Sequence, residues 1–393
     1  MSQFESVKAL HDRSLMPTYG RFPVALESGH GATAVDVDGR QYIDFGSGIG
    51  VNALGYCDAG WVAAVTAQAN KLQHCSNLYY NPVQIETAAA LCRATGMGRV
   101  FFGNSGAEAN ECAIKLARKY SFDKYGAGRA TVIGMRNSFH GRTVTTLSAT
   151  GQDVFHNYFF PFTEGFRFVD AGDMAALEAA ADDTVCAVML ECIQGEGGVI
   201  PLPAAYLQAV RAFCDAHDLL LLIDEVQTGA GRTGRFLACE HAGIRPDVVT
   251  MAKGLGGGLP IGACLCTERL ADVMGAGMHG STFGGNPIAC AAAKYMIETL
   301  SAPAFLAAVT EKGERMRARL AAMRHVSDVR GAGMMLGVAL DAGTARDVAN
   351  ACLEKGLLIL TAKTLLRLLP PLNISDDELS RGMDILESVL KGL

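Results

Sequence analysis

The feature that most constrains the fold of this chain is an alternation of short β-rich runs with helical patterns between Gln84 and about Leu270. Strands that alternate with helices usually pair in a mostly parallel sheet, with the helices on its faces. We therefore expect an α/β domain in this region. The expected strands are RVFF, ATVIGM, CAVMLE, LLLLID, DVVTMA and IGACLC, which begin at residues 99, 130, 186, 219, 247 and 261.

The rest of the chain indicates a second, smaller domain. The 393 residues, half of them apolar, exceed the roughly 250 to 300 residues at which a single core stops growing. Alternating apolar and polar residues around Asp38-Gly39 predict a β-hairpin. We expect an N-terminal segment, residues 1–45, that packs with a small α+β domain, residues 286–393, beside a large domain, residues 46–285. Outside the alternating region, helices are expected at 59–73, 288–299, 306–323 and 376–390, and strands at 331–340 and 365–369.

Charge and composition exclude several kinds of protein. The chain has 34 basic and 40 acidic residues and no Lys/Arg block, so nucleic acid is not an expected partner. Its opening residues are charged, and it has no run of about eighteen apolar residues, which favours a cytoplasmic protein without a membrane segment. The twelve cysteines are scattered singly, with no CxxC pair. We expect reduced, mostly buried thiols and no metal site.

Two ionisable residues follow two of the expected strands. The run LLLLI ends in Asp224, and the run VVTMA ends in Lys253. Ligands bind beyond the carboxyl ends of strands in an open parallel sheet, so both side chains would face one crevice. An amine and a carboxylate there suit an aldehyde cofactor of the pyridine type, because Lys253 could bond the aldehyde while Asp224 keeps the ring nitrogen protonated. The alternatives are a helix-capping Asp and a solvent-exposed Lys.

The segment FFGNSGAEANE predicts an anion site. A strand meets a Gly-rich turn, and Ser105 begins a helix with Glu108 three residues later, which is the spacing of a capping box. The backbone N–H groups of Ser105, Gly106 and Ala107 would point out of the positive end of this helix, which suits a phosphate. The alternative is an ordinary capped helix.

A serine hydrolase is a competing hypothesis for the same segment. GNSGA approximates the G-x-S-x-G nucleophile motif, with Ala107 in the last place. Ser105 would then be the nucleophile, and Asp224 with His241 or His279 would complete a triad. Only chain order supports that triad, and it leaves Lys253 without a role.

Aromatic and polar side chains in other segments could contact a ring-shaped ligand. In NSFHGRT, Phe139 could stack on a flat ring, with Val226 on the other face and Gln227 on the ring hydroxyl. Ser281 and Thr282, in the Gly-rich segment HGSTFGGNP, could offer hydroxyls to a phosphate.

Charged side chains in three segments are candidates for binding a substrate. Arg142 could bind a carboxylate bidentately, unless NSFHGRT is a turn with a surface arginine. Arg367 interrupts an apolar run, so it must be paired or must face a ligand. Glu191 ends the expected strand CAVML, whereas Glu196 lies in the Gly-rich loop that follows, and carboxylates in loops are usually solvated.

Taken together, these segments resemble the class III, fold type I aminotransferases, which use pyridoxal 5′-phosphate (PLP). The resemblance covers nearly the whole chain and implies a large domain with a mostly parallel, seven-stranded-type sheet between helices, plus a smaller α+β domain. It is carried by TYGRFPVALESGHG, GIGVNALGY, FFGNSGAEANE, FHGRT with TLSATGQ, IQGEGGVIP, DEVQTGAGRTG, AKGLGGGLPIGA, HGSTFGGNP and LLRLLPPL.

The resemblance also implies residue roles. Lys253 would bind PLP covalently and move a proton, and Asp224 would pair with the ring nitrogen. Arg142 would hold the α-carboxylate of an acylated amino donor and Arg367 that of glutamate, with Glu196 masking Arg367 while the donor is bound. The remaining implied contacts are Val226 and Phe139 on the ring, Gln227 on its hydroxyl, Ser105, Gly106 and Ala107 on the phosphate, Thr282 on the phosphate of the neighbouring subunit, and Ser281 and Tyr19 near the substrate.

The implied activity is transfer of the δ-amino group of N2-acetylornithine to 2-oxoglutarate, by a cytoplasmic homodimer in arginine biosynthesis. Gly48 stands where ornithine aminotransferases typically carry a tyrosine, which would leave room for an acyl group. Succinylornithine, ornithine and 4-aminobutyrate remain alternative donors. A catalytically silent PLP-fold binding protein is a remote alternative.

Overall fold

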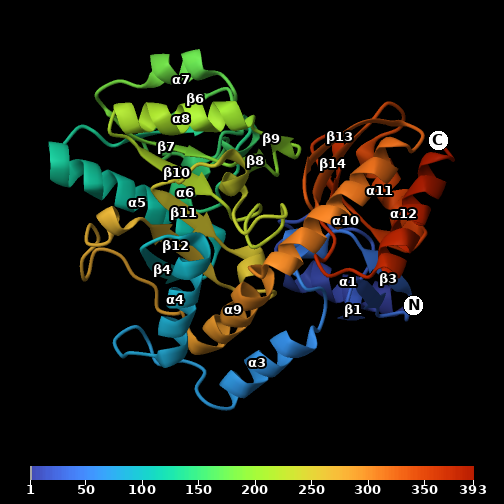
Figure 1. Cartoon of the computed structure of the whole chain (residues 1–393). Coiled ribbons are helices and arrows are strands. Elements are labelled where there is room, and N and C mark those ends of the chain that lie inside the picture. Colours follow the sequence, from blue (N-terminus) through green and yellow to red (C-terminus); the bar gives the residue numbers. More distant parts are fainter. Residues whose placement is uncertain (1) are drawn as a thin grey trace.

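A seven-stranded sheet forms the centre of the larger part of the molecule in this computed structural model, which describes residues 2–393 (Figure 1). Neighbouring strands are parallel except β12, which is antiparallel to the strands on either side of it. The expected α/β fold is thereby confirmed. In spatial order the strands are β4 (Arg99–Gly103), β12 (Gly262–Cys266), β11 (Val248–Met251), β10 (Leu220–Asp224), β7 (Val185–Leu190), β5 (Thr131–Met135) and β6 (Phe166–Val169).

All six expected runs are strands of this sheet, but the sequence pattern does not predict the seventh. β6 lies at the edge and pairs with β5. Of its four residues only Val169 is fully buried, and Arg167 interrupts its apolar pattern. An edge strand of this kind lacks the continuous apolar run that identifies the central strands.

The central strands are buried on both faces, which explains their continuous apolar runs. Successive side chains of a strand point to opposite faces. Leu220 and Leu222 pack in the core beneath α5 (Gly106–Tyr125), whereas Leu221 and Ile223 pack on the other side with α8 (Ala204–Ala216). Further helices of this region are α3 (Ala59–Ala69), α4 (Pro82–Thr95), α6 (Val144–Ala149) and α7 (Met174–Ala180).

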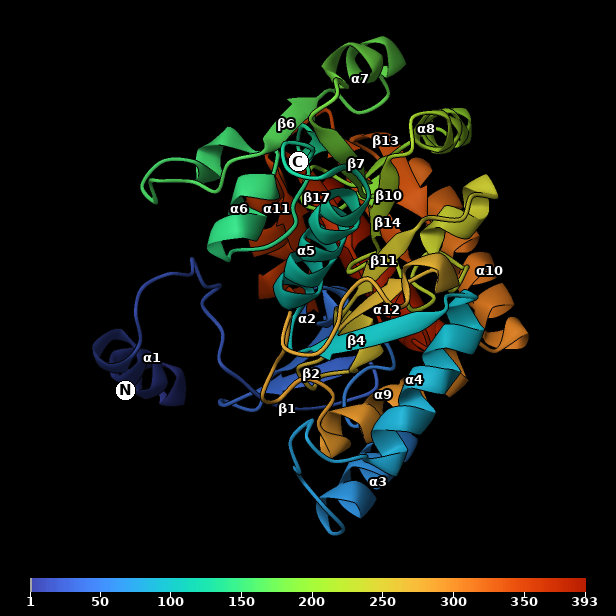
Figure 2. The same ribbon diagram turned by 90° about the vertical axis from the view of Figure 1, so that its left-hand side faces the viewer.

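Both ends of the chain contribute to a second sheet, of order β1-β2-β3-β15. The hairpin predicted around Asp38-Gly39 is confirmed, with Ala34 opposite Tyr42. β15 runs parallel to β3, so a segment from the N-terminal part of the chain pairs directly with one from the C-terminal part. The domain boundaries predicted from the sequence, after residues 45 and 285, remain predictions. The bounds are β1 (Leu26–His30), β2 (Thr33–Asp36), β3 (Gln41–Asp44) and β15 (Leu357–Leu358), preceded by α1 (Gln3–Ser14), which stands away from the body of the molecule in Figure 2.

The C-terminal part corrects one prediction, because residues 331–340 are not a single strand. They span a hairpin in which Gly333 adopts a left-handed φ of +52°. The sequence pattern does not predict this turn, because turns are usually polar and Met334, which lies in the turn, is completely buried. The third sheet has the order β13 (Val326–Ala332), β14 (Met335–Leu340), β17 (Leu365–Leu368) and β16 (Leu360–Ala362), and its helices are α9 (Pro287–Leu300), α10 (Pro303–Ala321), α11 (Ala345–Glu354) and α12 (Asp376–Leu390).

Two composition-based predictions can be compared with the structure. All twelve cysteines are free thiols, and they are buried or half-buried except Cys57, which is exposed. Across residues 2–393, none of the helices has both the length and the apolar character that a membrane crossing requires.

Candidate active site

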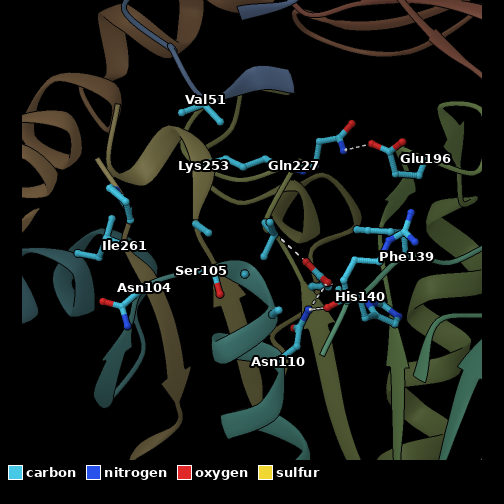
Figure 3. A pocket seen from close by; sticks show the side chains of 18 of the residues that line it. Val51, Asn104, Ser105, Asn110, Phe139, His140, Glu196, Gln227, Lys253 and Ile261 are labelled. Carbon is cyan, nitrogen blue, oxygen red and sulfur yellow. Dashed lines mark hydrogen bonds and ion pairs between the residues drawn. The ribbon is translucent and has the colours of Figure 1, made fainter. Parts of the chain in front are cut away.

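A cavity of about 470 Å³ lies at the carboxyl ends of β10 and β11, beside the N-terminus of α5 (Figure 3). Its position agrees with the expectation that ligands bind beyond strand ends in a sheet of this type. Lys253, Gln227 and Glu196 lie along one side of the view, with Ser105 and His140 on the opposite side. The predicted site residues that line the cavity are Ser105, Gly106, Ala107, Phe139, Arg142, Glu196, Asp224, Val226, Gln227 and Lys253.

Asp224 is held by three hydrogen bonds at the end of β10. Its Oδ2 accepts from Nδ2 of Asn110 and from Nδ1 of His140, each at 2.8 Å, and its Oδ1 accepts from the backbone N–H of Val226 at 2.9 Å. An ionised carboxylate can only accept, so Nδ1 of His140 carries the proton. The carboxylate is 4% exposed and therefore has one fixed orientation at the cavity wall.

Asn110 and His140 support this carboxylate, although no sequence pattern predicted a role for either residue. Asn110 accepts a hydrogen bond of 2.6 Å from Oγ1 of Thr250 and donates one of 2.8 Å to the carbonyl of His140. Burial of the His140 ring favours its neutral form, but Asp224 and Glu191 outweigh burial and raise the His140 pKa. The available signal was a polar residue, Asn110, at helical spacing from the buried Ala113 and Ala117 of α5.

Glu191, which follows the last residue of β7, is buried. Its Oε1 accepts from the backbone N–H of Phe139 at 2.9 Å, and its Oε2 accepts from that of Gly195 at 3.2 Å. Burial raises the pKa of this carboxyl to about 7. One side chain thus ties the segment that carries Phe139 to the loop that carries Glu196.

Lys253 begins a short 3-10 turn, Lys253–Leu255, which is separated from β11 by Ala252. Its φ of +47° lies in the left-handed region, which is rare for a residue with a long side chain and typical of functional sites. Burial lowers the pKa of its amine, and the nearby charge of Arg367 acts in the same direction, while Glu196 opposes both. The turn therefore delivers a buried amine to the cavity.

The N-terminus of α5 leaves backbone donors unused. Oγ of Ser105 accepts from the N–H of Glu108 at 3.2 Å, as predicted, but the Glu108 carboxylate accepts from the N–H of Asn104 rather than closing a full capping box. Among residues 2–393, the N–H groups of Ser105, Gly106 and Ala107 have no acceptor. A Cβ on Gly106 would lie 2.8 Å from the methyl groups of Val226, so only glycine allows this approach.

Glu196, Arg367 and Gln227 form one polar cluster at the cavity. Nη1 of Arg367 donates to Oε1 of Glu196 and, at 3.1 Å, to Oε1 of Gln227, whose Nε2 donates to Glu196 at 3.3 Å. Burial favours the protonated form of Glu196, yet the charge of Arg367 outweighs burial and lowers the Glu196 pKa. The predicted pairing of these two residues is present. Gln227, expected on a ring hydroxyl, belongs to this cluster and also lines the cavity.

Arg142 faces the cavity without a charged partner. Over the described part of the chain, its guanidinium has no hydrogen bond or ion pair, and it lies 3.9 Å from the centre of the Phe155 ring. A guanidinium in that state can bind a carboxylate through two parallel N–H groups.

Some predicted residues lie outside the cavity of this single chain. Thr282 and Tyr19 are exposed, the latter by 75%. Ser281 does not line the cavity but contacts a residue that does. Its Oγ accepts a hydrogen bond of 3.0 Å from Nδ2 of Asn104, which lines the cavity. Gly48 has a left-handed φ of +62°, so its backbone conformation by itself favours glycine.

The residues of the alternative hydrolase triad are not assembled. Asp224 bonds His140, whereas His241 contacts Thr233 and His279 contacts Lys115. Within residues 2–393 no hydrogen bond joins Ser105 to either of these histidines. The geometry therefore does not support a serine nucleophile.

Comparison with known proteins agrees with this geometry. The chain is 51% identical to the acetylornithine aminotransferase of Haemophilus ducreyi, with 98% of each chain covered. It is 48% identical to that of Caldanaerobacter subterraneus subsp. tengcongensis, with 96% of this chain and 97% of the relative covered. The similar solved structures include the ornithine aminotransferase of Toxoplasma gondii ME49 (TM-score 0.95, 33% identity, 100% and 96% covered) and the N-acetylornithine aminotransferase of Stenotrophomonas maltophilia K279a (TM-score 0.85, 38% identity, 98% of each covered).

The fold and the cavity thus define an aminotransferase, an enzyme that moves an amino group between two small molecules. The family model "Aminotransferase class-III" matches residues 15–390, and the chain belongs to the class-III aminotransferases. This family depends on PLP, and a second structure of the T. gondii enzyme holds PLP at partial occupancy in its active site.

Proposed function

We propose that this enzyme uses PLP to transfer the δ-amino group of N2-acetylornithine to 2-oxoglutarate, giving N-acetylglutamate 5-semialdehyde and glutamate. The observation that carries the proposal is one cavity lined by a buried amine, a fixed carboxylate, unused backbone donors and Arg142, with a second arginine, Arg367, paired to the lining residue Glu196. Relatives named acetylornithine aminotransferase, 44–51% identical over nearly the whole chain, favour this donor. We place the reaction in cytoplasmic arginine biosynthesis.

The residues present fit PLP. The N–H groups of Ser105, Gly106 and Ala107 stand at a helix N-terminus, which suits a phosphate. Gly106 and Val226 pack so closely that a Cβ would close the space between them. Asp224 is a buried carboxylate with a fixed orientation, which suits a protonated ring nitrogen, and Phe139 is an aromatic wall. When bound, PLP supplies a reactive aldehyde and a ring that withdraws electrons.

Lys253 has two tasks in this proposal. Its amine holds the cofactor, and during the reaction its Nζ accepts the proton from the amine-bearing carbon of the substrate. Its lowered pKa serves both tasks, because a neutral amine is the form that attacks an aldehyde and accepts a proton. Asp224 would pair with the ring nitrogen, and Asn110 and His140 hold its carboxyl group in place.

The two arginines would bind the carboxylates of different substrates. Arg142, without a charged partner, binds the α-carboxylate of acetylornithine. Arg367 binds a carboxylate of glutamate or 2-oxoglutarate after Glu196 leaves it. The Glu196–Arg367 pair therefore masks a charge that would otherwise lie unpaired in a buried site while the donor reacts.

A homodimer with shared active sites is part of the proposal. Thr282 does not line the cavity of its own chain, and its segment and a neighbouring one carry exposed apolar side chains: Leu78, Tyr80 and Phe283 are 88%, 97% and 62% exposed. Asn77 links the two segments by donating to the carbonyls of Ser281 and Gly284, each at 3.0 Å. Large exposed apolar side chains on two linked segments favour a protein interface there.

Mixing two inactive variants tests the shared site. A heterodimer of a Lys253→Ala chain and a Thr282→Val chain would contain one cavity with both the lysine and the partner's threonine. Activity should rise when the two proteins are refolded together and should stay low when each is refolded alone. No recovery, with heterodimers demonstrated by differential tagging, would show that Thr282 acts in its own chain or has no part in the site.

A half-reaction comparison tests the substrate. The PLP-loaded enzyme is mixed separately with acetylornithine, succinylornithine, ornithine and 4-aminobutyrate, and the loss of the cofactor's visible absorption is followed. We expect the highest rate per concentration with acetylornithine. Ornithine is the second candidate, because the T. gondii ornithine aminotransferase is structurally so similar. A Lys253→Ala control should release PLP on dialysis, and wild-type protein that takes up no PLP would refute the proposal.

A further inference from the structure

We infer that Phe155 is a positioning residue that holds Arg142 ready for the substrate carboxylate. The inference rests on the proposed function, because it concerns the donor that Arg142 binds. Phe155 ends the 3-10 turn Asp153–Phe155 and is half-buried. It does not line the cavity itself, so it can act on a substrate only through another residue.

Three side chains form a cluster at this edge of the cavity. Cζ of Arg142 lies 3.9 Å from the centre of the Phe155 ring and 5.5 Å from that of Phe139. The two rings meet edge to face, with centres 6.1 Å apart and planes inclined by 76°. The guanidinium therefore lies over the Phe155 ring, and the Phe139 ring meets the Phe155 ring edge to face.

Stacking can orient this arginine without using its hydrogen-bond donors. The five N–H groups of a guanidinium lie in its plane, whereas an aromatic ring contacts its flat face. A carboxylate partner would hold Arg142 equally well but would occupy the donors that the substrate needs. Since Arg142 is exposed and otherwise unpaired over residues 2–393, contact with Phe155 restricts its long side chain before a ligand arrives.

Phe155 is itself tied to the segment that carries Arg142. The N–H of Phe155 donates to the carbonyl of Gln152 at 3.0 Å. Nε2 of Gln152 donates to the carbonyl of Ser138 at 3.1 Å, and Oγ of Ser138 accepts from the N–H of Gly151 at 3.0 Å. The ATGQ segment thus fixes the Phe155 ring against the NSFHGRT segment. The role that we infer for the ATGQ segment is to hold Phe155 in place beside Arg142.

The test compares ligands that differ in the α-carboxylate. Acetylornithine and N-acetylputrescine are donors with and without it, and N-acetyl-L-norvaline and N-acetylbutylamine are the corresponding pair that lacks a transferable amine. Phe155→Leu and Phe155→Met remove the ring, and Phe155→Tyr retains it. Phe159→Leu, the same change at a 57% exposed ring nearby, is the matched control. KM and kcat are measured for the donors, and calorimetry of the PLP-loaded proteins gives Kd for the other pair.

Phe155→Leu and Phe155→Met should raise KM for acetylornithine and Kd for N-acetyl-L-norvaline about 3- to 30-fold, with kcat little changed, as expected for loss of a cation–π contact. Phe155→Tyr and Phe159→Leu should match the wild type, and no variant should alter binding of the ligands without a carboxylate. Equal weakening of both ligand classes, or no weakening, would overturn the inference. If the wild type transaminates none of the donors, the proposed function fails, and the Kd of N-acetyl-L-norvaline still decides the role of Phe155.

Discussion

Nδ1 of His140 donates a hydrogen bond of 2.8 Å to Oδ2 of Asp224, and both side chains are buried. His140 thereby keeps a buried carboxylate oriented toward the cavity. Its other ring nitrogen, Nε2, is buried and has no partner among the described residues. Within residues 2–393, the imidazole ring of His140 therefore makes a single hydrogen bond, the one to Asp224. A substitution at position 140 can remove this bond or supply another donor.

Replacing His140 should lower activity in a graded way. His140→Leu removes the donor and leaves a buried carboxylate short of one partner, which should cost about 1.5 to 3 kcal/mol, or roughly 10- to 150-fold in kcat/KM. His140→Asn retains an N–H group near the position of Nδ1 and should lose much less. Steady-state kinetics at saturating PLP measure both variants. Equal losses for Leu and Asn would mean that the hydrogen bond to Asp224 is not the important contact.

Arg142→Ala should impair the acetylornithine half-reaction and spare the glutamate half-reaction. Loss of a charged contact to the α-carboxylate is expected to cost about 2 to 5 kcal/mol of transition-state binding. Arg142→Lys should recover a part of this, because an ammonium cannot form the two parallel bonds of a guanidinium. Rapid-mixing measurements of each half-reaction provide the comparison. A similar loss in both half-reactions would place Arg142 outside donor recognition.

Glu196→Ala should shift the substrate preference toward glutamate. The change removes the carboxylate that pairs with Arg367 and leaves this arginine available from the start. We expect a lower KM for glutamate and a lower kcat/KM for acetylornithine, whose neutral end would meet an unmasked charge. Glu196→Gln keeps a hydrogen-bonding oxygen and should give a smaller shift. An unaltered ratio of the two kcat/KM values would contradict the masking role.

The stability of the protein should fall between pH 5 and pH 8 through Glu225, which follows Asp224 in the chain. Burial raises the pKa of Glu225 to about 7, while its hydrogen bonds from Thr228 and Cys239 oppose this. Because the folded pKa lies above the unfolded one, the native state binds the proton more tightly. The contribution of Glu225 to the free energy of unfolding is fully present below the unfolded pKa. It is lost as the pH rises through 7, and the loss amounts to about 3 kcal/mol.

Glu225→Gln should flatten that pH dependence. A glutamine stays neutral and can accept from the Cys239 N–H and donate to Thr228. Urea unfolding of the PLP-free proteins at pH 5.5 and pH 8, at equal protein concentrations, measures the difference. Glu311→Gln, at an exposed position of α10, is the control and should follow the wild type. Parallel curves for wild type and Glu225→Gln would contradict the prediction.

Local sequence patterns predicted the elements that carry the site. The central strands were predictable because burial on both faces demands continuous apolar residues; Asp224 ends one of them, and Lys253 lies two residues beyond the end of the next. Ser105 was predictable because an N-cap needs a short polar side chain. The strand β6 and the turn at Gly333 were not predictable, since an edge strand needs no apolar run and a buried turn contains apolar residues such as Met334.

The amino-acid sequence by itself determined the fold class, the strand ends that face the cavity and the helix that offers backbone donors, because these follow from hydrophobic periodicity and capping within short segments. Only the tertiary structure decided which side chains support them. Asn110 and His140 reach Asp224 across 114 and 84 residues, and Phe155 reaches Arg142 through a turn that no periodicity marks. Such contacts depend on how distant segments meet in space, and a local pattern carries no information about that.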